Sequence, residues 1–246
     1  MGCFFFHPSL GENEVVTLPP EEGHHLEVER IGAGEEIFLG NGKGQLFRGV
    51  YLGKREGKHW VEVRERVQEE NPPFSIWVWQ AFLHAPSRLD WLVEKLTEIG
   101  VSRIVFFPAH RSLVLGASFQ RMGRWQKIVR SACKQSGRLT FPEVEVIESW
   151  NTFLTRLEKS SGTVLLTDFA ASQTLFQVVG AFRETAWNLV IGPEGDFTEE
   201  EKRVISALSQ ARGVKLLSKV LRSETAAVFG ASILVSLLDG THADCH

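Results

Sequence analysis

Hydrophobic and polar positions follow two different patterns along the chain, which meet near Asn71-Pro72-Pro73. Before this point, short apolar runs are separated by tight turns. The turn Gly40-Asn41-Gly42 lies between the runs Ile37–Leu39 and Leu46–Tyr51, and this spacing predicts a β-hairpin. Gly57 marks a second turn of the same kind. Roughly five short strands in about seventy residues are typical of a small β-barrel.

After the two prolines, apolar strands alternate with amphipathic helices. The predicted strands are residues 75–82, 103–107, 164–167 and 187–191, and the predicted helices include 89–99, 119–135 and 223–238. Such alternation favours a parallel sheet covered by helices on both faces. We therefore predict an α/β protein with two domains, a small β-barrel over residues 1–70 and a parallel-sheet domain over 74–246.

Two strand-to-helix turns near the C-terminus carry the strongest chemical signal. The buried run Trp187–Ile191 stops at Gly192-Pro193, which cannot continue a strand ladder. Thr198 then begins a helix, with Glu201 placed three residues later as in a capping box. A second apolar run leads into Leu221–Thr225, which opens the last helix. Two charged turns of this kind, so close together, are expected to form the walls of one ligand site.

The charge of the chain is unevenly distributed. The net charge is −3, yet eight Lys and Arg residues and no Asp or Glu lie between Ile99 and Pro142. In the helix predicted there, the apolar stripe that contains Trp125 and Val129 leaves the cations on the opposite face. Such a face is either simply solvated or directed at phosphates, and the lack of local acids favours phosphates. The RNA-binding candidates are Arg30, Arg111, Arg124, Lys127, Arg130, Lys134 and Arg138.

Several short motifs occur in the order typical of one family. Gly192–Gly195 reads GPEG and Leu221–Ala226 reads LRSETA. Further matches are His24–Arg30, Lys95–Val101, Arg111-Ser112 and Ala132–Arg138. This ordered set resembles the bacterial small-subunit (16S) ribosomal RNA uracil-N3 methyltransferases of the SPOUT superfamily. The resemblance implies a trefoil-knotted SPOUT domain after a PUA-like, RNA-binding barrel. It also implies S-adenosylmethionine as cofactor, a homodimer, and ribosomal RNA or the small subunit as partner.

The resemblance also assigns roles to individual residues. It implies a cofactor site formed by Leu166, Thr167, Asp168, Ile191, Gly192, Pro193, Glu194, Gly195, Leu217, Ser218, Val220, Leu221 and Thr225. Arg222 and Glu224 are the catalytic candidates. A helix N-terminus disfavours a cation, so Arg222 is expected to reach an anion, either a phosphate or a developing uracil oxyanion. The alternatives are an ion pair of Arg222 with Glu194 or Glu224, and a helix-capping role for Glu224 instead of proton acceptance.

The chain departs from the family pattern at three places. Asp196 stands where a second glycine is usual, Ser218-Lys219 replace a usual Gly-Pro/Arg, and His84 replaces a lysine. Two other functions therefore stay open at this point. The chain could methylate another RNA position such as a ribose 2′-oxygen, or act as a non-catalytic RNA-binding assembly factor.

Other classes of protein are not indicated. No apolar run is long enough for a membrane span, and the odd number of cysteines suggests reduced thiols in a cytoplasmic protein. No metal site is expected: His24 and His25 would face opposite ways on a strand and could not share one metal.

Overall fold

A computed structural model describes residues 4–112, 121–181 and 184–243 of the chain. Its residues form two compact units, one made of 1–71 with 130–141 and the other of 72–129 with 142–246. The second segment of the first unit belongs to a helix and the turn that follows it. The division into separately folding domains over 1–70 and 74–246 stays a prediction.

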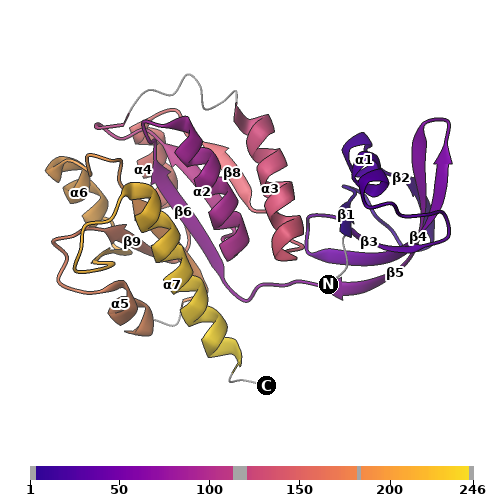
Figure 1. Cartoon of the computed structure of the whole chain (residues 1–246). Helices are drawn as coiled ribbons and strands as arrows, with labels where there is room; N and C mark the ends of the chain where they lie inside the picture. Colours follow the sequence, from indigo (N-terminus) through magenta and orange to yellow (C-terminus); the bar gives the residue numbers. More distant parts are fainter. Residues whose placement is uncertain (1–3, 113–120, 182–183, 244–246) are drawn as a thin grey trace. The chain divides into compact units, whose positions relative to one another are not determined.

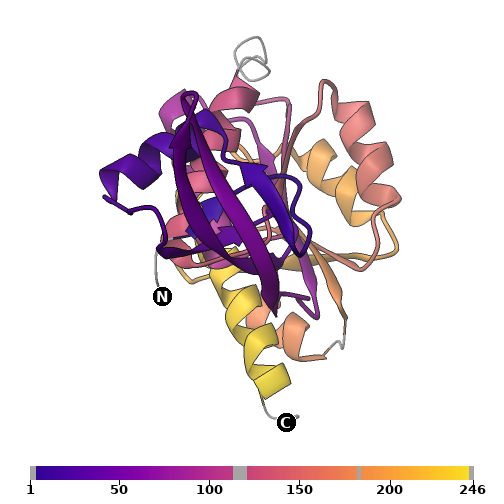
Figure 2. The same ribbon diagram turned by 90° about the vertical axis from the view of Figure 1, so that its right-hand side faces the viewer.

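The first unit is built on one sheet of five strands, drawn in indigo and purple in Figure 2. Its strands are β1 (Phe4–Phe6), β2 (Glu14–Thr17), β3 (Glu36–Gly40), β4 (Gln45–Arg55) and β5 (Lys58–Glu69), in the spatial order β1-β3-β4-β5-β2. β1 runs parallel to β3, and the other neighbours are antiparallel. The predicted hairpins are confirmed as the β3–β4 and β4–β5 pairs.

A helix that the sequence pattern did not predict packs on this sheet. It is α1 (Pro20–Val28), and it contains both His24 and His25, which had been expected on a strand. The proline at the first helical position supplies a preset φ, and glutamates in the first turn suit the helix dipole. Leu26 of α1 is 1% exposed and joins a core that includes Phe5 and Leu39.

The second unit contains the predicted parallel sheet. Its strands are β6 (Ser75–Ala81), β7 (Arg103–Phe107), β8 (Glu143–Val146), β9 (Thr163–Thr167), β10 (Ala186–Ile191) and β11 (Ala211–Val214), in the order β11-β9-β10-β6-β7-β8. Every pair in this sheet is parallel. The two edge strands, β8 and β11, were not predicted, because they are short and carry charged residues such as Glu145 and Arg212.

Helices cover both faces of this sheet (Figure 1). They are α2 (Pro86–Ile99), α3 (Met122–Ser136), α4 (Trp150–Glu158), α5 (Leu175–Ala181), α6 (Glu199–Ser206) and α7 (Ser223–Ala243). α2 and α7 pack against each other, and α7 crosses β6 and β10. On the opposite face, Phe153 of α4 and Ile205 of α6 share a core with Trp79 and Phe107. Residues 119 and 120, the predicted start of α3, lie outside the described residues.

The strand order reverses direction at the centre of this sheet. Successive strands β6, β7 and β8 run outward to one edge, whereas β9 begins on the other side and β10 inserts between β9 and β6. In open α/β sheets, ligands bind at the carboxyl ends of strands where the order reverses. The loops that follow β9 and β10 are therefore the place to look for a site.

Candidate active site

A hollow of about 490 Å³ opens beyond the carboxyl ends of β9 and β10. The predicted cofactor residues that line it are Thr167, Asp168, Ile191, Gly192, Pro193, Glu194, Leu217, Val220 and Leu221, and Arg222 lines it as well. Three segments far apart in sequence thus meet at one place. A hollow of this volume is large enough for a drug-sized ligand.

Four predicted cofactor residues lie outside the lining of this hollow. Leu166 is 2% exposed and packs in the core, because alternate residues of a strand face opposite sides of the sheet. Gly195 is at the outer side of its turn, where its carbonyl accepts a hydrogen bond from Arg111 Nη1 at 2.6 Å. Ser218 is solvent-exposed, and Thr225 lines a neighbouring hollow instead.

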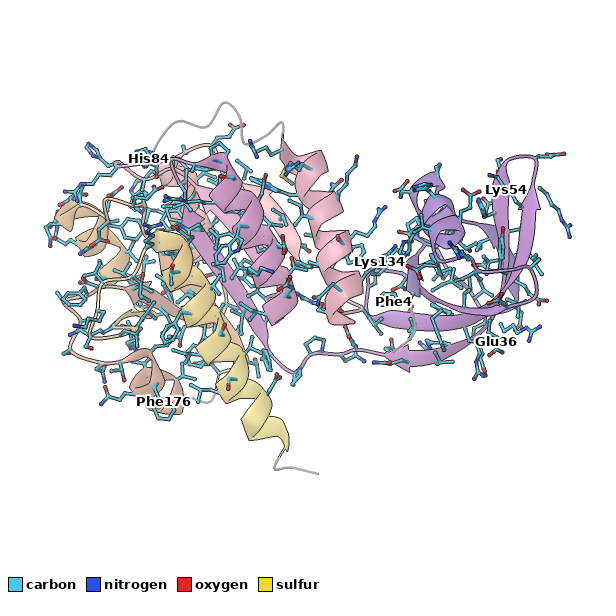
Figure 3. The ribbon with its side chains drawn as sticks, viewed as in Figure 1. Phe4, Glu36, Lys54, His84, Lys134 and Phe176 are labelled. Carbon is cyan, nitrogen blue, oxygen red and sulfur yellow. The ribbon has the colours of Figure 1, made fainter. Side chains whose placement is uncertain are left out.

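One wall of the hollow is the loop after β10, and polar contacts hold its Glu194. The amide of His84, a residue labelled in Figure 3, donates to Glu194 Oε1 at 2.9 Å, and the His84 ring Nδ1 lies 2.8 Å from Oε2. Arg88 Nη1 lies 3.4 Å from the same carboxylate. Burial by itself would raise the pKa of Glu194, but the hydrogen bonds from His84 outweigh it and the pKa is lowered. The departure at His84 therefore supplies a partner for Glu194.

Asp196, the departure from the family pattern that lies within this loop, also has specific contacts that hold it. Its φ is 59°, a left-handed value that glycine adopts without strain. Asp196 Oδ1 accepts from the Phe197 amide at 2.8 Å, which fixes the turn. Lys202 Nζ lies 2.8 Å from Asp196 and 3.1 Å from Asp168. Burial tends to lower the pKa of Lys202, yet the hydrogen bonds that its ammonium group donates to these two carboxylates raise the pKa overall.

A buried amide joins this loop to the start of α7. Gln80 of β6 is fully buried, and its Nε2 donates to Ser223 Oγ at 2.8 Å. The Ser223 hydroxyl in turn donates to the carbonyl of Gly192. Both turns that were singled out in the sequence are thereby fixed to the same point of the central strand.

The opposite wall is the segment between β11 and α7. It presents exposed apolar side chains, and Val220 is 79% and Leu217 41% exposed. In the part of the chain that the structure describes, no side-chain hydrogen bond involves Leu216–Arg222. The exposed surface of this wall is therefore mainly apolar. Its residues Leu216–Leu221 form no strand, contrary to the second strand-to-helix turn expected there.

The two catalytic candidates lie at the junction of two hollows. Arg222 lines both the hollow described above and a second one of about 300 Å³. Glu224 lines the second hollow, is 8% exposed, and its Oε1 lies 3.5 Å from Arg88 Nε. Among the described residues, no carboxylate lies within ion-pair distance of Arg222, whereas both Glu194 and Glu224 pair with Arg88. The alternative ion pair for Arg222 is not formed.

The RNA-binding candidates have more partners than the sequence suggested. Arg124 Nε donates to Asp90 Oδ2 at 2.7 Å. Arg130 forms an ion pair with Glu21, and Lys134 forms one with the buried Glu22. Arg111 donates to the Gly195 carbonyl, as described above. Lys127 and Arg30 are exposed, and Arg138 is half-buried. The local sequence of this face lacks acidic residues, but other elements supply several carboxylates that pair with its cations. The expectation that these cations would lack acidic partners was therefore wrong for Arg124, Arg130 and Lys134.

Three residues that matter at the site were missed from the sequence. Arg88 lies in the first turn of α2, two residues after the proline that starts the helix, and it belongs to none of the motifs singled out in the sequence. Lys202 looked like an ordinary helix-surface cation. Gln80 did leave a signal that could have been used: it is a lone amide in an otherwise apolar strand, and buried amides need partners.

Two further classes of site are absent from the described residues. They contain no group of three or more His, Cys, Asp or Glu side chains that could hold a metal ion. None of the described helices combines the length and the apolar character that crossing a membrane would require.

Comparison with known proteins gives a consistent picture. The model of the RNA methyltransferase domain family matches residues 69–235. The ribosomal RNA small subunit methyltransferase E of Mycobacterium bovis is 31% identical, over 94% of this chain and 91% of that protein.

Solved structures agree over nearly the whole chain. The structure of ribosomal RNA small subunit methyltransferase E from Neisseria gonorrhoeae bound to S-adenosyl methionine has a TM-score of 0.83 at 28% identity, and the match covers 96% of this chain and 97% of that one. A Legionella pneumophila protein in complex with the cofactor SAM has a TM-score of 0.83 at 25% identity, covering 96% and 98%. The chain belongs to the RNA methyltransferase family, among the relatives named ribosomal RNA small subunit methyltransferase E.

Proposed function

We propose that this protein transfers a methyl group from S-adenosylmethionine to N3 of one uridine in small-subunit (16S) ribosomal RNA. The observation that carries the proposal is the position of Arg222 and Glu224, which line adjoining hollows at the reversal point of the sheet. The relatives' names indicate the RNA, and the Neisseria gonorrhoeae structure contains S-adenosyl methionine.

The 490 Å³ hollow fits this cofactor chemically. Apolar side chains such as Ile191, Leu217 and Leu221 would cover the adenine ring. Carboxylates of Asp168 and Glu194 stand at the rim and could accept hydrogen bonds from ribose hydroxyls, and the same negative charges favour a sulfonium ion. The bound cofactor would supply an activated methyl group that leaves sulfur as a neutral thioether.

The protein must then manage one proton and one developing charge. Uracil N3 carries a hydrogen, and its electron pair becomes available when that proton leaves. Glu224 would accept the proton at Oε2, the N3–C bond would form as the S–C bond breaks, and the proton would later pass to water. Arg222 would stabilise the negative charge that spreads onto a uracil carbonyl oxygen.

The remaining family features are part of the same proposal. They are a trefoil knot in the second unit, a PUA-like RNA-binding role for the first unit, a homodimer, and a cytoplasmic location. The exposed cations Lys127 and Arg30 would contact phosphates. The dimer is implied by the family resemblance alone, since the small residues of α7 pack within the chain: a Cβ at Gly230 would lie 2.9 Å from Leu189, and Ala227 and Ala231 are buried.

The test combines binding and product identity. The purified protein is titrated calorimetrically with S-adenosylhomocysteine and then incubated with labelled cofactor and small ribosomal subunits that lack the modification. We expect about one equivalent bound per chain and N3-methyluridine after digestion of the RNA to nucleosides. A 2′-O-methylated nucleoside would overturn the assigned position, and absence of binding and transfer would overturn the assigned reaction.

A further inference from the structure

The second hollow, of about 300 Å³, adjoins the proposed cofactor hollow and shares Arg88 and Arg222 with it. Its other lining residues are Ser87, Trp91, Glu224 and Thr225. Glu224 Oε2 is buried and has no hydrogen-bond partner among the residues that the structure describes. An unpaired buried carboxylate oxygen is costly, so its presence points to a donor that arrives with a ligand.

The polar groups of this hollow form a recognisable sequence of donors and acceptors. Glu224 contributes an acceptor, and the two guanidinium groups of Arg88 and Arg222 contribute donors. Uracil presents the complementary pattern on its Watson–Crick edge: the acceptor O2, the donor N3–H and the acceptor O4. Cytosine presents an acceptor at N3, which a carboxylate would repel. We propose that this hollow holds the flipped target base, and that Arg88 is the residue that selects uracil by donating to one of its carbonyl oxygens.

The aromatic side chain of the hollow suits the same ligand. Trp91 lies one helical turn after Arg88 on α2, and 41% of its surface is exposed. An unstacked base that leaves its RNA helix commonly stacks on an aromatic ring, since every base offers a π-face. Trp91 would thus hold the plane of the base, while the three charged groups read its edge.

Arg88 is already held close to where it would act. Its guanidinium lies 3.5 Å from Glu224 Oε1 and 3.4 Å from Glu194 Oε1, so it bridges one carboxylate of each hollow. Neither contact is short, and the Glu194 carboxylate keeps both hydrogen bonds from His84 when Arg88 is removed. Losing Arg88 should therefore affect the RNA step much more than cofactor binding.

The inference rests on the proposed function, and the experiment separates the two. Arg88→Gln, Trp91→Ala and Trp91→Phe are compared with Arg203→Gln, in which an exposed arginine of α6 paired with Glu200 is changed. Each variant is titrated with S-adenosylhomocysteine and assayed for methyl transfer to small subunits lacking the modification. If the wild type neither binds nor transfers, the proposed function fails, whatever the variants do.

We expect Arg88→Gln and Trp91→Ala to lower kcat/KM for the subunit about 10-fold or more, the size of one lost base contact. Cofactor affinity should change less than about threefold, and Trp91→Phe and Arg203→Gln should behave as the wild type. Small subunits with cytidine at the target position should compete poorly with uridine-containing subunits for the wild-type enzyme. In Arg88→Gln the difference between the inhibition caused by the uridine and cytidine forms should be smaller. Equal kinetics of Arg88→Gln and Arg203→Gln would overturn the inference for Arg88. A change of oligomeric state in Trp91→Ala would overturn it for Trp91.

Discussion

The two walls of the 490 Å³ hollow are built in opposite ways. The loop after β10 is tied down on several sides: Glu194 contacts His84 and Arg88, Asp196 contacts Lys202, and the Gly192 carbonyl accepts from Ser223. The facing wall, Leu216–Leu221, exposes Leu217 and Val220, and none of its described side chains forms a hydrogen bond.

This difference suggests a division of labour within one site. Side chains that are already hydrogen-bonded need no reordering when a ligand arrives, so the β10 wall can fix position at low entropic cost. Exposed apolar side chains gain free energy only when something covers them, so the second wall contributes on ligand binding. Changes in the first wall should alter both stability and affinity, whereas changes in the second should alter affinity alone.

The largest effect is expected where the second wall meets α7. Arg222→Ala should reduce single-turnover methyl transfer by about 10²–10³-fold, the cost of removing one oxyanion donor, and leave cofactor affinity nearly unchanged. Arg222→Lys, which keeps a charge but not the fork of donors, should recover part of the rate. Unchanged turnover in the alanine variant would remove Arg222 from the chemistry.

A change in the tied-down wall should come next. Glu194→Gln removes the charge that pairs with Arg88 and His84, and we expect calorimetric affinity for S-adenosylhomocysteine to fall about 10-fold. The melting temperature should fall as well. Loss of affinity with no change in melting temperature would contradict a structural role for these contacts.

The Lys202 contacts should have a smaller effect. Lys202→Met leaves Asp168 and Asp196 without their shared cation, and it should cost about 1 kcal/mol in the free energy of unfolding. Asp196→Gly in the same background should restore part of this loss, because glycine accepts the φ of 59° without strain and removes one charge. Strictly additive effects of the two changes in denaturant titrations would show that they are not coupled.

The exposed wall should respond only to ligand. Val220→Ser removes apolar surface that is 79% solvent-exposed in the free protein, so the free energy of unfolding should stay the same. Cofactor affinity should fall about fourfold, since the serine variant buries roughly one methyl group less on binding. A measurable drop in stability would show that this wall is packed in the free protein.

The smallest expected effect is a pH dependence of the first wall. The pKa of Glu194 is lowered by folding from its ordinary value of 4.5, so the folded state binds its proton less readily than the unfolded chain. The resulting stabilisation is complete above the ordinary value and is lost as the pH falls through the lowered one. The difference in melting temperature between the wild type and Glu194→Gln should therefore shrink below about pH 4.5 and stay constant above pH 6.

Features of the fold that depend on local sequence patterns could be predicted from the sequence, whereas features that depend on contacts between distant residues could not. The central strands were predictable because burial on both faces of the sheet requires continuous apolar runs, and α2 was predictable because its buried residues recur with the helical period. The capping box of α6 is a local motif, and the structure confirms it. β8 and β11 were missed since edge strands need not be apolar. The helix α1 was missed because its apolar positions show no helical period, only a proline start.

The candidate site shows the same limit more sharply. The walls of the hollow could be located because each contains or adjoins a short, contiguous motif: GPEG lies in the loop after β10, and LRSETA begins at Leu221, where the second wall ends. The contacts of Arg88, the ion pair of Lys202 with Asp168, and the pairing of Arg130 and Lys134 with α1 all join residues that are distant in sequence. The order of charges along a chain does not reveal such pairs. For this reason the sequence did not predict that carboxylates from other elements pair with several cations of the basic face.

The hydrogen bond from Gln80 to Ser223 has a consequence for how the protein is made. It spans 143 positions of the chain and joins β6, an early strand of the second unit, to the first turn of its last helix. On the ribosome the sheet can begin to assemble while the C-terminal segment is still being translated. The hollow, however, lacks its second wall and Arg222, the proposed catalytic arginine, until that segment has emerged. A nascent chain in which α7 has not yet emerged should thus be inactive, so that newly made enzyme becomes competent only after this helix has packed on β6 and β10.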